Sequence, residues 1–349
     1  QSLIATKTER IVYAAKGDGV MEFGLRRAQG PDAGTYGARA AMIAGCIGTS
    51  NVLAGKLFGI PVSGTHAHSW VMSFPDEISA FRAYAEAFPK NCILLVDTYD
   101  VAQGVRNAIT VGLEMRARGE RLAGIRIDSG DLAWLAKMAR RMLDQAGLSD
   151  CGIVLSNDLD EFTIQSIRDE GAQVMSWGVG TKLACAYDQP TLGGVYKLSA
   201  TREPGEREWT DRLKISESVG KLTTPGVLDV RRYFYCDNGR LAGDMVFDVN
   251  APGDQSREVI VDPADDLRQK NLAGLCSKTL LEPLARDGRT VLDAAGRDAQ
   301  AARARAQKGL ALLDESQKRM LNPHTYPVGL EYGLFERRRE LVARMRGIA

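Results

Sequence analysis

Polar side chains that could do chemistry follow a series of short apolar runs, where predicted strands give way to loops. They comprise arginines, acids, two histidines and a glycine turn. The loops are Glu22–Arg27, Gly64–Ser69, Asp97–Asp100, Arg126–Asp131, Ser156–Asp160 and Gly178–Lys182. In a parallel barrel the carboxyl ends of the strands all face one mouth, so we expect these side chains to converge there. The set is suited to an anionic ligand.

The stretch from Gly178 to Thr181 joins a predicted strand to a helical stretch. Free backbone N–H groups and the helix dipole at such a junction attract phosphate. The stretch has neither the Walker lysine nor the G-x-G-x-x-G spacing, so an ordinary strand-to-helix turn is an equal alternative. The position of Gly178, Gly180 and Thr181 at the shared mouth favours phosphate.

Arg126, Asp128 and Asp131 occupy one strand-end loop. Alternation along a strand places Arg126 and Asp128 on the same face, pointing into the mouth. Arg126 could bind a carboxylate, and Asp128 could bind ribose hydroxyls or Mg²⁺. The structural alternative is an Arg–Asp ion pair, with Asp131 capping the next helix.

His66 and His68 are two of the three histidines of the chain. Histidines at this spacing could be structural, or could bind a metal, although no third His or Cys ligand lies nearby. A neutral imidazole beside a phosphate site is also a nucleophile towards phosphoryl groups. Covalent phosphohistidine chemistry is therefore the sharper hypothesis.

Alternating strands and helices must position these loops, and the pattern predicts an α/β fold with a parallel sheet. Helical stretches separate the runs, among them Ile78–Phe88, Asp100–Arg118, Asp131–Ala146 and Asp158–Gly171. Regular spacing and apolar character on both faces favour a closed, irregular TIM-like barrel over an open sheet. The expected strands are Val20–Gly24, Ile60–Ser63, Cys92–Val96, Ala123–Ile127, Gly152–Leu155, Gln173–Ser176 and Gly194–Leu198.

Three segments are expected along the chain. Residues 1–18 have helical spacing and suggest the remnant of an amino-terminal domain, and residues 19–200 form the barrel core with the active site. Residues 201–349 are expected to complete the barrel and a smaller α+β domain built from the chain ends. They contain a hairpin turn at Asp237-Asn238-Gly239 and an amphipathic helix over Arg297–Leu321.

Composition excludes several functional classes. Lys and Arg number 45 against 44 acidic residues and are interspersed, so we expect no nucleic-acid partner and no membrane partner. The six cysteines form no C-x-x-C pair, which predicts reduced structural thiols and a cytoplasmic protein.

Taken together, the strand-end motifs resemble those of nicotinate phosphoribosyltransferases, a family of type II phosphoribosyltransferases. The resemblance implies an ATP-dependent, ligase-type condensation of nicotinate with phosphoribosyl pyrophosphate, giving nicotinate mononucleotide and pyrophosphate in NAD biosynthesis. It implies Mg²⁺, ATP as co-substrate and a homodimer with a shared active site. The matching stretches are EFGLRRAQGPD (22–32), SNVLAGKLFGIPVSGTHAHSWVMSF (50–74), LLVDTYD (94–100), GIRIDSGDL (124–132), SNDLDE (156–161) and GVGTKLACAYDQPTLGGVYKL (178–198).

The resemblance also implies roles for particular residues. The family's Gly-Thr-x-Ala-His-Ser motif places the phosphorylated histidine at His68 and leaves His66 at the variable position. The residues implied at the nicotinate pocket are Thr65, Arg126 and Arg26. Those expected at phosphoribosyl pyrophosphate are Thr181, Gly178, Gly180, Asp158 and Asp128, and Asp128 is also the candidate Mg²⁺ ligand.

Members of the family carry an amino-terminal region that contributes an aromatic residue to stack on the pyridine ring, and we expect this sequence to begin after it. Two alternatives stay open. One is a phosphoribosyltransferase for nicotinamide or quinolinate, although the arginines favour a carboxylate. The other is a catalytically silent barrel that keeps the loops without turnover.

Overall fold

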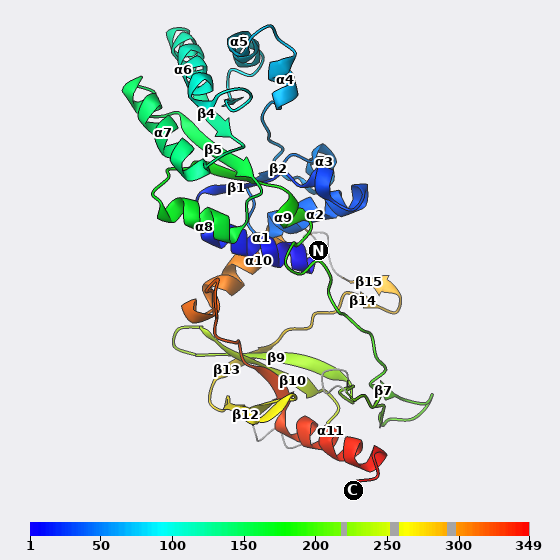
Figure 1. Ribbon diagram of the computed structural model, residues 1–349. Helices are drawn as coiled ribbons and strands as arrows, with labels where there is room; N and C mark the ends of the chain where they lie inside the picture. The colour runs from blue at the N-terminus through cyan, green and yellow to red at the C-terminus, as the bar shows by residue number, and fades with distance from the viewer. Residues whose placement is uncertain (218–221, 252–257, 292–297, 349) are drawn as a thin grey trace. The chain divides into compact units, whose positions relative to one another are not determined.

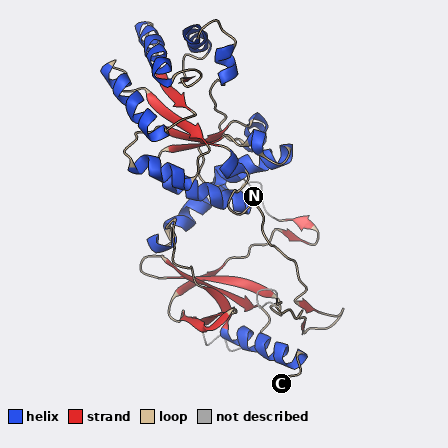
Figure 2. Ribbon diagram, in the orientation of Figure 1, coloured by secondary structure: helices blue, strands red, loops and turns tan. Residues whose placement is uncertain are grey.

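The computed structural model describes residues 1–217, 222–251, 258–291 and 298–348, which divide into two units (Figure 1). The first unit consists of Gln1–Leu192 with Ala294–Gln307, and the second of Gly193–Asp293 with Lys308–Ala349. Helices surround the sheet of the first unit, whereas strands dominate the second (Figure 2). The division falls after Leu192 rather than at residue 200.

A six-stranded parallel sheet forms the centre of the first unit, in the order β2-β1-β6-β5-β4-β3. This is the cyclic order of a barrel, and it confirms the expected α/β barrel class. The strands are β1 (Gly19–Glu22), β2 (Gly48–Thr49), β3 (Cys92–Leu95), β4 (Leu122–Ile127), β5 (Gly152–Asn157) and β6 (Ser176–Val179). Their side chains are largely buried, with Trp177 and Leu94 fully enclosed.

The barrel does not close as expected, because β2 and β3 are not hydrogen-bonded to each other. The predicted strand at Ile60–Ser63 makes only an isolated bridge, between Val62 and Thr49. Pro61 lacks an N–H donor and so limits a ladder there. The sheet is therefore a curled half-barrel with an open edge at β3.

Two other predicted strands differ from the structure. β6 starts at Ser176, where the sequence predicted a strand to end, and all four of its residues are buried, with Trp177 and Val179 at 0% exposure. The stretch Gly194–Leu198 forms no strand, and its Tyr196 is fully exposed. Without an apolar partner this segment has nothing to pack a strand against.

Helices follow the strands as predicted, within a few residues at each end. Several begin with an aspartate whose side chain accepts a backbone N–H, as Asp131 does from Trp134. The helices of this unit are α1 (Ser2–Ala15), η1 (Leu25–Arg27), α2 (Pro31–Ile43), α3 (Val52–Phe58), α4 (His68–Met72), α5 (Glu77–Ala87), α6 (Val101–Ala117), α7 (Leu132–Gln145), α8 (Glu161–Asp169) and α9 (Thr181–Ala184).

Residues 1–18 belong to the first unit rather than to a separate domain. Helix α1 packs against α8 and α2. Lys7 on α1 is buried and lies 2.7 Å from Glu161 on α8, and it also pairs with Asp188. The chain's amino-terminal helix is thus held by the barrel through a buried ion pair.

The second unit is built around another six-stranded sheet, in the order β12-β11-β16-β10-β9-β13. Its strands are β9 (Leu228–Phe234), β10 (Leu241–Asp248), β11 (Val259–Asp262), β12 (Asp265–Asn271), β13 (Cys276–Thr279) and β16 (Val328–Glu331). Helix α11 (Tyr332–Met345) packs on β11 and β16. Two short pairs are β7 (Ala200–Thr201) with β8 (Thr210–Asp211), and β14 (Ala285–Arg286) with β15 (Arg289–Thr290).

The predicted hairpin turn lies between β9 and β10, with Gly239 at φ +72. The predicted helix over Arg297–Leu321 is shorter than expected. Helix α10 (Ala299–Ala311) ends before a separate turn η4 (Glu315–Gln317), which Asp314 begins with a capping box. Arg297 lies outside the described residues.

The prediction that all six cysteines are reduced is wrong for two of them. Cys236 and Cys276 form a disulfide in the second unit, with Cα atoms 5.3 Å apart. Strand β13 pairs with β9 antiparallel from Cys276 onward, which brings the two residues together. Cys46, Cys92, Cys151 and Cys185 are free, and burial raises the pKa of the Cys92 and Cys151 thiols to about 12.

Candidate functional site

Arg126, near the end of β4, is the centre of a hydrogen-bonded cluster at the carboxyl ends of the strands. Its Nε donates to Ser156 Oγ at 2.7 Å, and its terminal nitrogens donate to Thr65 Oγ1 at 2.8 Å and Asp128 Oδ1 at 2.9 Å. Ser156 also donates to Asp128. One guanidinium thus joins the ends of β4 and β5 to the Gly64–Ser69 loop. The Arg126–Asp128 ion pair of the structural alternative is thus present, and ligand binding by these two residues stays a prediction.

The guanidinium of Arg126 keeps capacity for a ligand. Among its contacts with the described residues, one N–H on each terminal nitrogen is left without a protein acceptor. Two such donors match the two oxygens of a carboxylate. The side chain is 17% exposed, so a ligand can reach it while much of the surrounding water is excluded.

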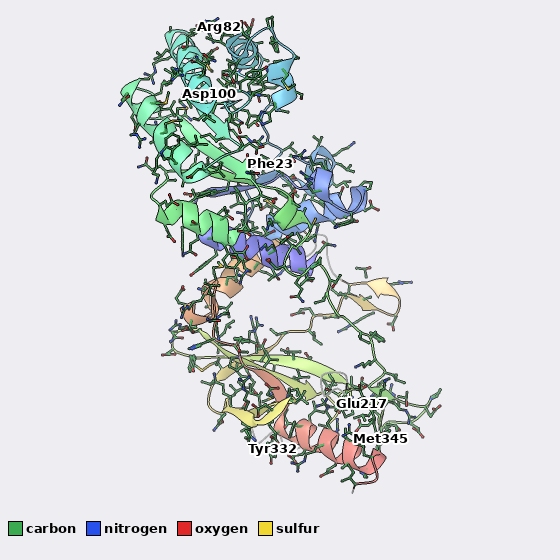
Figure 3. The ribbon with its side chains drawn as sticks, in the orientation of Figure 1. Phe23, Arg82, Asp100, Glu217, Tyr332 and Met345 are labelled. Carbon is green, nitrogen blue, oxygen red and sulfur yellow. A yellow bond between two sulfur atoms is a disulfide. The ribbon has the colours of Figure 1, made fainter. Side chains whose placement is uncertain are left out.

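Phe23 directly follows β1 (Figure 3). Its ring lies beside Arg126, whose guanidinium carbon is 5.5 Å from the ring centroid. Gly178 lies directly against this ring, since a Cβ there would come within 2.6 Å of Phe23 Cε2. Gly178 therefore makes room for an aromatic side chain, a role that the sequence did not suggest. The sequence did contain a signal for Phe23, because the motif EFG places an aromatic residue at the end of a predicted strand, just before the two arginines.

Glu22 fixes the turn that carries Phe23. Its buried carboxylate accepts a hydrogen bond of 2.5 Å from Thr49 Oγ1 on β2 and another from the backbone N–H of Gly24. Burial raises the pKa of this carboxyl. A side chain on Gly24 would overlap Ala184 and the Glu22 carboxylate, so the turn requires glycine.

His68 begins helix α4, and its side chain is 41% exposed. Its Nδ1 lies 3.2 Å from Thr98 Oγ1. Its Nε2 lies 3.8 Å from Asp97 Oδ1 and 4.0 Å from Asp128 Oδ2. These last two distances are too long for hydrogen bonds, so the ring Nε2 faces two carboxylates without bonding to either.

Asp97 is a site residue to which the sequence assigned no role. Its side chain is fully buried, and its Oδ2 accepts from the Asp128 backbone N–H at 3.0 Å and from Ser129 Oγ at 2.6 Å. Its Oδ1 has no hydrogen-bond partner among the described residues and lies on the side of His68. Such an oxygen is available to an imidazole N–H or to a cation.

His66 does not share the partners of His68. It is 6% exposed and packs against the rings of Phe81 and Tyr84. Burial lowers the pKa of its imidazole to about 4, so the ring is neutral at physiological pH. Within the described ranges no three His, Cys, Asp or Glu side chains come together as a metal site, and the two histidines have separate roles.

Arg26, Asp158 and Thr181 lie outside the cluster. Arg26 is exposed on η1, Asp158 is exposed after β5, and Thr181 starts the four-residue helix α9. In the described part of the chain, none of them hydrogen-bonds to Arg126, His68 or their partners. Between Ser156 and Asp158, Asn157 has φ 129, a strained value for a residue with a side chain, and such strain gathers at functional sites.

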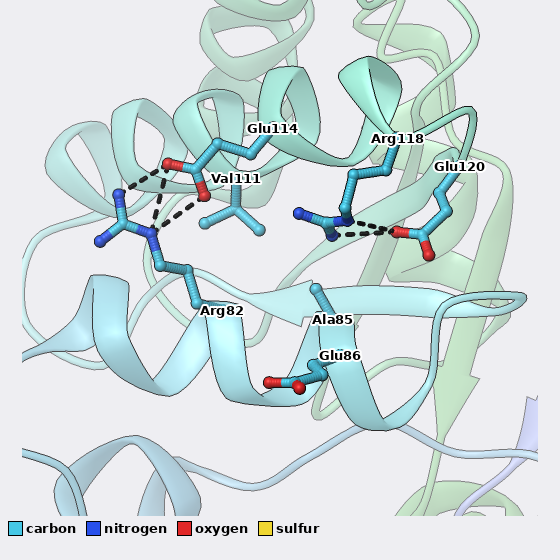
Figure 4. Close-up of a pocket in the computed structure, with 7 residues that line it drawn as sticks. All are labelled: Arg82, Ala85, Glu86, Val111, Glu114, Arg118 and Glu120. Carbon is cyan, nitrogen blue, oxygen red and sulfur yellow. Dashed lines mark hydrogen bonds and ion pairs between the residues drawn. The ribbon is translucent and has the colours of Figure 1, made fainter.

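Two surface hollows of the first unit do not have Arg126 among their lining residues. One, of about 350 Å³, lies between α5 and α6 (Figure 4). Its Arg82 is held by Glu114 and its Arg118 by Glu120, so each arginine already has a carboxylate partner. The other, of about 550 Å³, is lined by Thr65, His66 and aromatic side chains of α4 and α5. Only the second borders the loop of the candidate site.

The helices of the described residues include none that combines the length and apolar character of a membrane span.

Comparison with known proteins places the chain in a family. The chain matches the nicotinate phosphoribosyltransferase (NAPRTase) family over residues 19–208 and the nicotinate phosphoribosyltransferase C-terminal domain over residues 229–338. It is 45% identical over 335 residues to a nicotinate phosphoribosyltransferase of Bacillus subtilis, and 36% identical over 305 residues to one of Dictyostelium discoideum. These alignments cover 95% and 74% of this chain.

The fold is similar to the crystal structure of human nicotinic acid phosphoribosyltransferase, with a TM-score of 0.79 and 30% identity over 97% of this chain and 74% of that one. The chain spans 66% of the length of the Bacillus subtilis relative and 51% of that of the Dictyostelium discoideum relative. Both units of the structure correspond to regions that the family models describe. The chain belongs to the nicotinate phosphoribosyltransferase family.

Proposed function

We propose that this protein is a nicotinate phosphoribosyltransferase that supplies nicotinate mononucleotide for NAD biosynthesis. The pyridine nitrogen of nicotinate attacks the anomeric carbon of phosphoribosyl pyrophosphate, a carbon–nitrogen bond forms, and the bond to pyrophosphate breaks. The observation that carries the proposal is Arg126, which holds one free N–H on each terminal nitrogen beside the Phe23 ring. A flat ring with a carboxylate fits such a surface.

Catalysis then depends mainly on positioning. Arg126 binds the nicotinate carboxylate, Thr65 holds Arg126, and the Phe23 ring supports the face of the pyridine. No general base is needed, because the attacking nitrogen carries a lone pair and no proton. The ribose carbon gains positive charge as pyrophosphate leaves, and the carboxylate of Asp128, which pairs with Arg126, would stabilise that charge.

His68 is the proposed phosphate carrier in an ATP-assisted, ligase-type cycle. Its imidazole displaces ADP from the γ-phosphorus of ATP, and water later cleaves the phosphorus–nitrogen bond. The phosphoryl group would attach at Nδ1, beside the Thr98 hydroxyl, because an anion at Nε2 would meet the carboxylates of Asp97 and Asp128. The same carboxylates stabilise the cation that phosphorylation creates.

A magnesium ion fits this site as a partner of the substrates. Asp97 Oδ1, which has no hydrogen-bond partner among the described residues, and the Asp128 carboxylate offer oxygen ligands of the kind that Mg²⁺ prefers. Since the described residues form no three-ligand cluster, phosphate oxygens and water would complete its shell. Bound there, the ion would neutralise charge on the leaving pyrophosphate.

Asp158, Gly178, Gly180 and Thr181 are proposed to contact phosphoribosyl pyrophosphate, and the exposed Arg26 is proposed to contact nicotinate. The resemblance to the family further supports a homodimer in which the partner completes the site.

The test is to incubate the chain with phosphoribosyl pyrophosphate, Mg²⁺ and ATP, and to compare nicotinate, nicotinamide and quinolinate by mass spectrometry. We expect nicotinate mononucleotide to be the dominant product. A dominant product from nicotinamide or quinolinate would show that this compound, and not nicotinate, is the substrate. If none of the three gave a mononucleotide, the chain would be a catalytically silent barrel.

A further inference from the structure

His66 lies between the open edge of the half-barrel and the helix that carries His68. Strand β3 pairs with β4 on one side only. On the other side, the backbone N–H of Leu95 has no neighbouring strand, and it donates to His66 Nε2 at 3.0 Å. The imidazole thus takes the place of a strand at the point where the barrel fails to close.

The second ring nitrogen of His66 makes the connection to helix α4. Because Nε2 accepts a hydrogen bond, the neutral ring carries its proton on Nδ1. Nδ1 lies 3.4 Å from the carbonyl oxygen of Ala67, which is the N-cap residue of α4. The ring also packs edge-on against Tyr84, with centroids 4.7 Å apart. Its position is therefore fixed from three directions.

Two functional side chains depend on the position of this loop. Thr65 donates to the carbonyl oxygen of His66 at 3.1 Å and accepts from Arg126 at 2.8 Å. His68 follows Ala67 and faces Asp97, which lies two residues beyond Leu95, the last residue of β3. A bond from His66 to Leu95 therefore sets where both Thr65 and His68 stand relative to the end of β3.

We propose that His66 is a positioning residue. Its imidazole accepts a hydrogen bond from Leu95 at the open edge of β3, a contact that we call the clamp. The clamp holds the Gly64–Ser69 loop in place and so positions Thr65 and His68 for the reaction. The catalytic part of this inference depends on the proposed function, whereas the clamp itself does not. The sequence could not indicate the clamp, because it depends on an unpaired strand edge.

The clamp is tested first without any substitution, by ¹⁵N NMR of the full chain. We expect the Nδ1–H tautomer for His66 and a scalar coupling across the hydrogen bond from the Leu95 amide to His66 Nε2. In His66→Leu the Leu95 amide should exchange with solvent at least about 10²-fold faster. His66→Gln retains an acceptor near the position of Nε2 and should keep the amide protected. An Nε2–H tautomer in the wild type would overturn the clamp.

The catalytic arm uses the same variants, with His324→Leu in the second unit as a matched control. For His66→Leu we expect kcat to fall about 10-fold and KM for nicotinate to rise severalfold, because both Thr65 and His68 lose their placement. His66→Gln and the control should stay within about 3-fold of wild type. Unchanged kinetics in a folded His66→Leu would refute the positioning role.

If His66→Leu does not fold, His66→Asn, which keeps the polar contact to Ala67 but not the acceptor for Leu95, replaces it in both arms. A wild-type chain that makes no mononucleotide would refute the proposed function, and the NMR arm would still decide the clamp.

Discussion

The cluster around Arg126 and the exposed loops around it are two different kinds of binding surface. Arg126, Asp128 and Ser156 hold one another through hydrogen bonds before any substrate arrives. Arg26 and Asp158 are exposed and take no part in that network. Folding therefore fixes the side chains of the first region, whereas Arg26 and Asp158 take their places outside that network.

This difference predicts which substitutions change catalysis and stability, and which change only the binding of a substrate. Substitutions in the cluster should disturb chemistry and stability together, because each removal leaves a polar group without its partner. Substitutions in the exposed loops should change only the affinity for a substrate. The following predictions test that division, from the largest expected effect to the smallest.

His68→Ala should abolish ATP hydrolysis and the stimulation of product formation by ATP, while some ATP-independent turnover remains. The alanine lacks the nitrogen that accepts phosphate, and the exposed side chain contributes little to the fold. Product formation with and without ATP is the measurement, and His324→Ala is the control that should behave as wild type. If ATP still stimulated product formation in His68→Ala, His68 would not be the phosphate carrier.

Asp97→Asn should lower kcat in the presence of ATP by about 10- to 100-fold. The amide can still accept from the Asp128 N–H and Ser129, but it no longer places negative charge beside His68 Nε2. Steady-state kinetics measure the effect. Asp100→Asn, which changes a helix cap in the same loop, is the matched control, and an equal loss in both variants would contradict a specific role for Asp97.

Acidification should weaken the first unit through His66. Burial, with the nearby charges of Arg126 and His68, holds the pKa of its imidazole at about 4, below the usual value of about 6.5. The unfolded chain therefore binds a proton more readily, so stability is fully present above pH ~6.5 and declines as the pH falls towards ~4. At pH 5 the loss is about 2 kcal/mol.

Tryptophan fluorescence during urea unfolding measures this loss, because three of the four tryptophans, Trp70, Trp134 and Trp177, lie in the first unit. His66→Gln should lose less stability between pH 7 and pH 5 than wild type. Equal losses in both proteins would show that another group is responsible.

Asp158→Asn should raise KM for phosphoribosyl pyrophosphate only severalfold and leave the melting temperature unchanged. The side chain is exposed and outside the cluster, so it contributes binding without supporting the fold. A melting temperature lowered by several degrees would contradict the division between the two regions.

Much of this arrangement could be predicted from the sequence, because it follows from local patterns. Apolar runs ending in polar loops predicted the parallel strands, and Asp131 was predicted to cap its helix, as it does. The pairing of Arg126 with Asp128 followed from alternation along one strand. Each of these inferences needs only neighbouring residues.

The features that the sequence did not reveal depend on contacts between distant segments. The barrel remains open because Ile60–Ser63 forms a single bridge, and this leaves Leu95 for His66 to bind. Gly178 proved to be the neighbour of Phe23 on another strand. The Cys236–Cys276 disulfide likewise depends on the pairing of β13 with β9. Such relations are fixed by tertiary packing and have no local signature.

The central claim is that Arg126 recognises a carboxylate, and the most direct test is the ratio of kcat/KM for nicotinate to that for nicotinamide in wild type and in Arg126→Ala. Nicotinamide serves as an internal control, since it shares the ring and any structural damage but lacks the charge. The account predicts that the substitution lowers kcat/KM for nicotinate by roughly 10²-fold or more, chiefly through KM, and so collapses the ratio. A ratio that stays at its wild-type value would contradict the assignment of Arg126 to the nicotinate carboxylate.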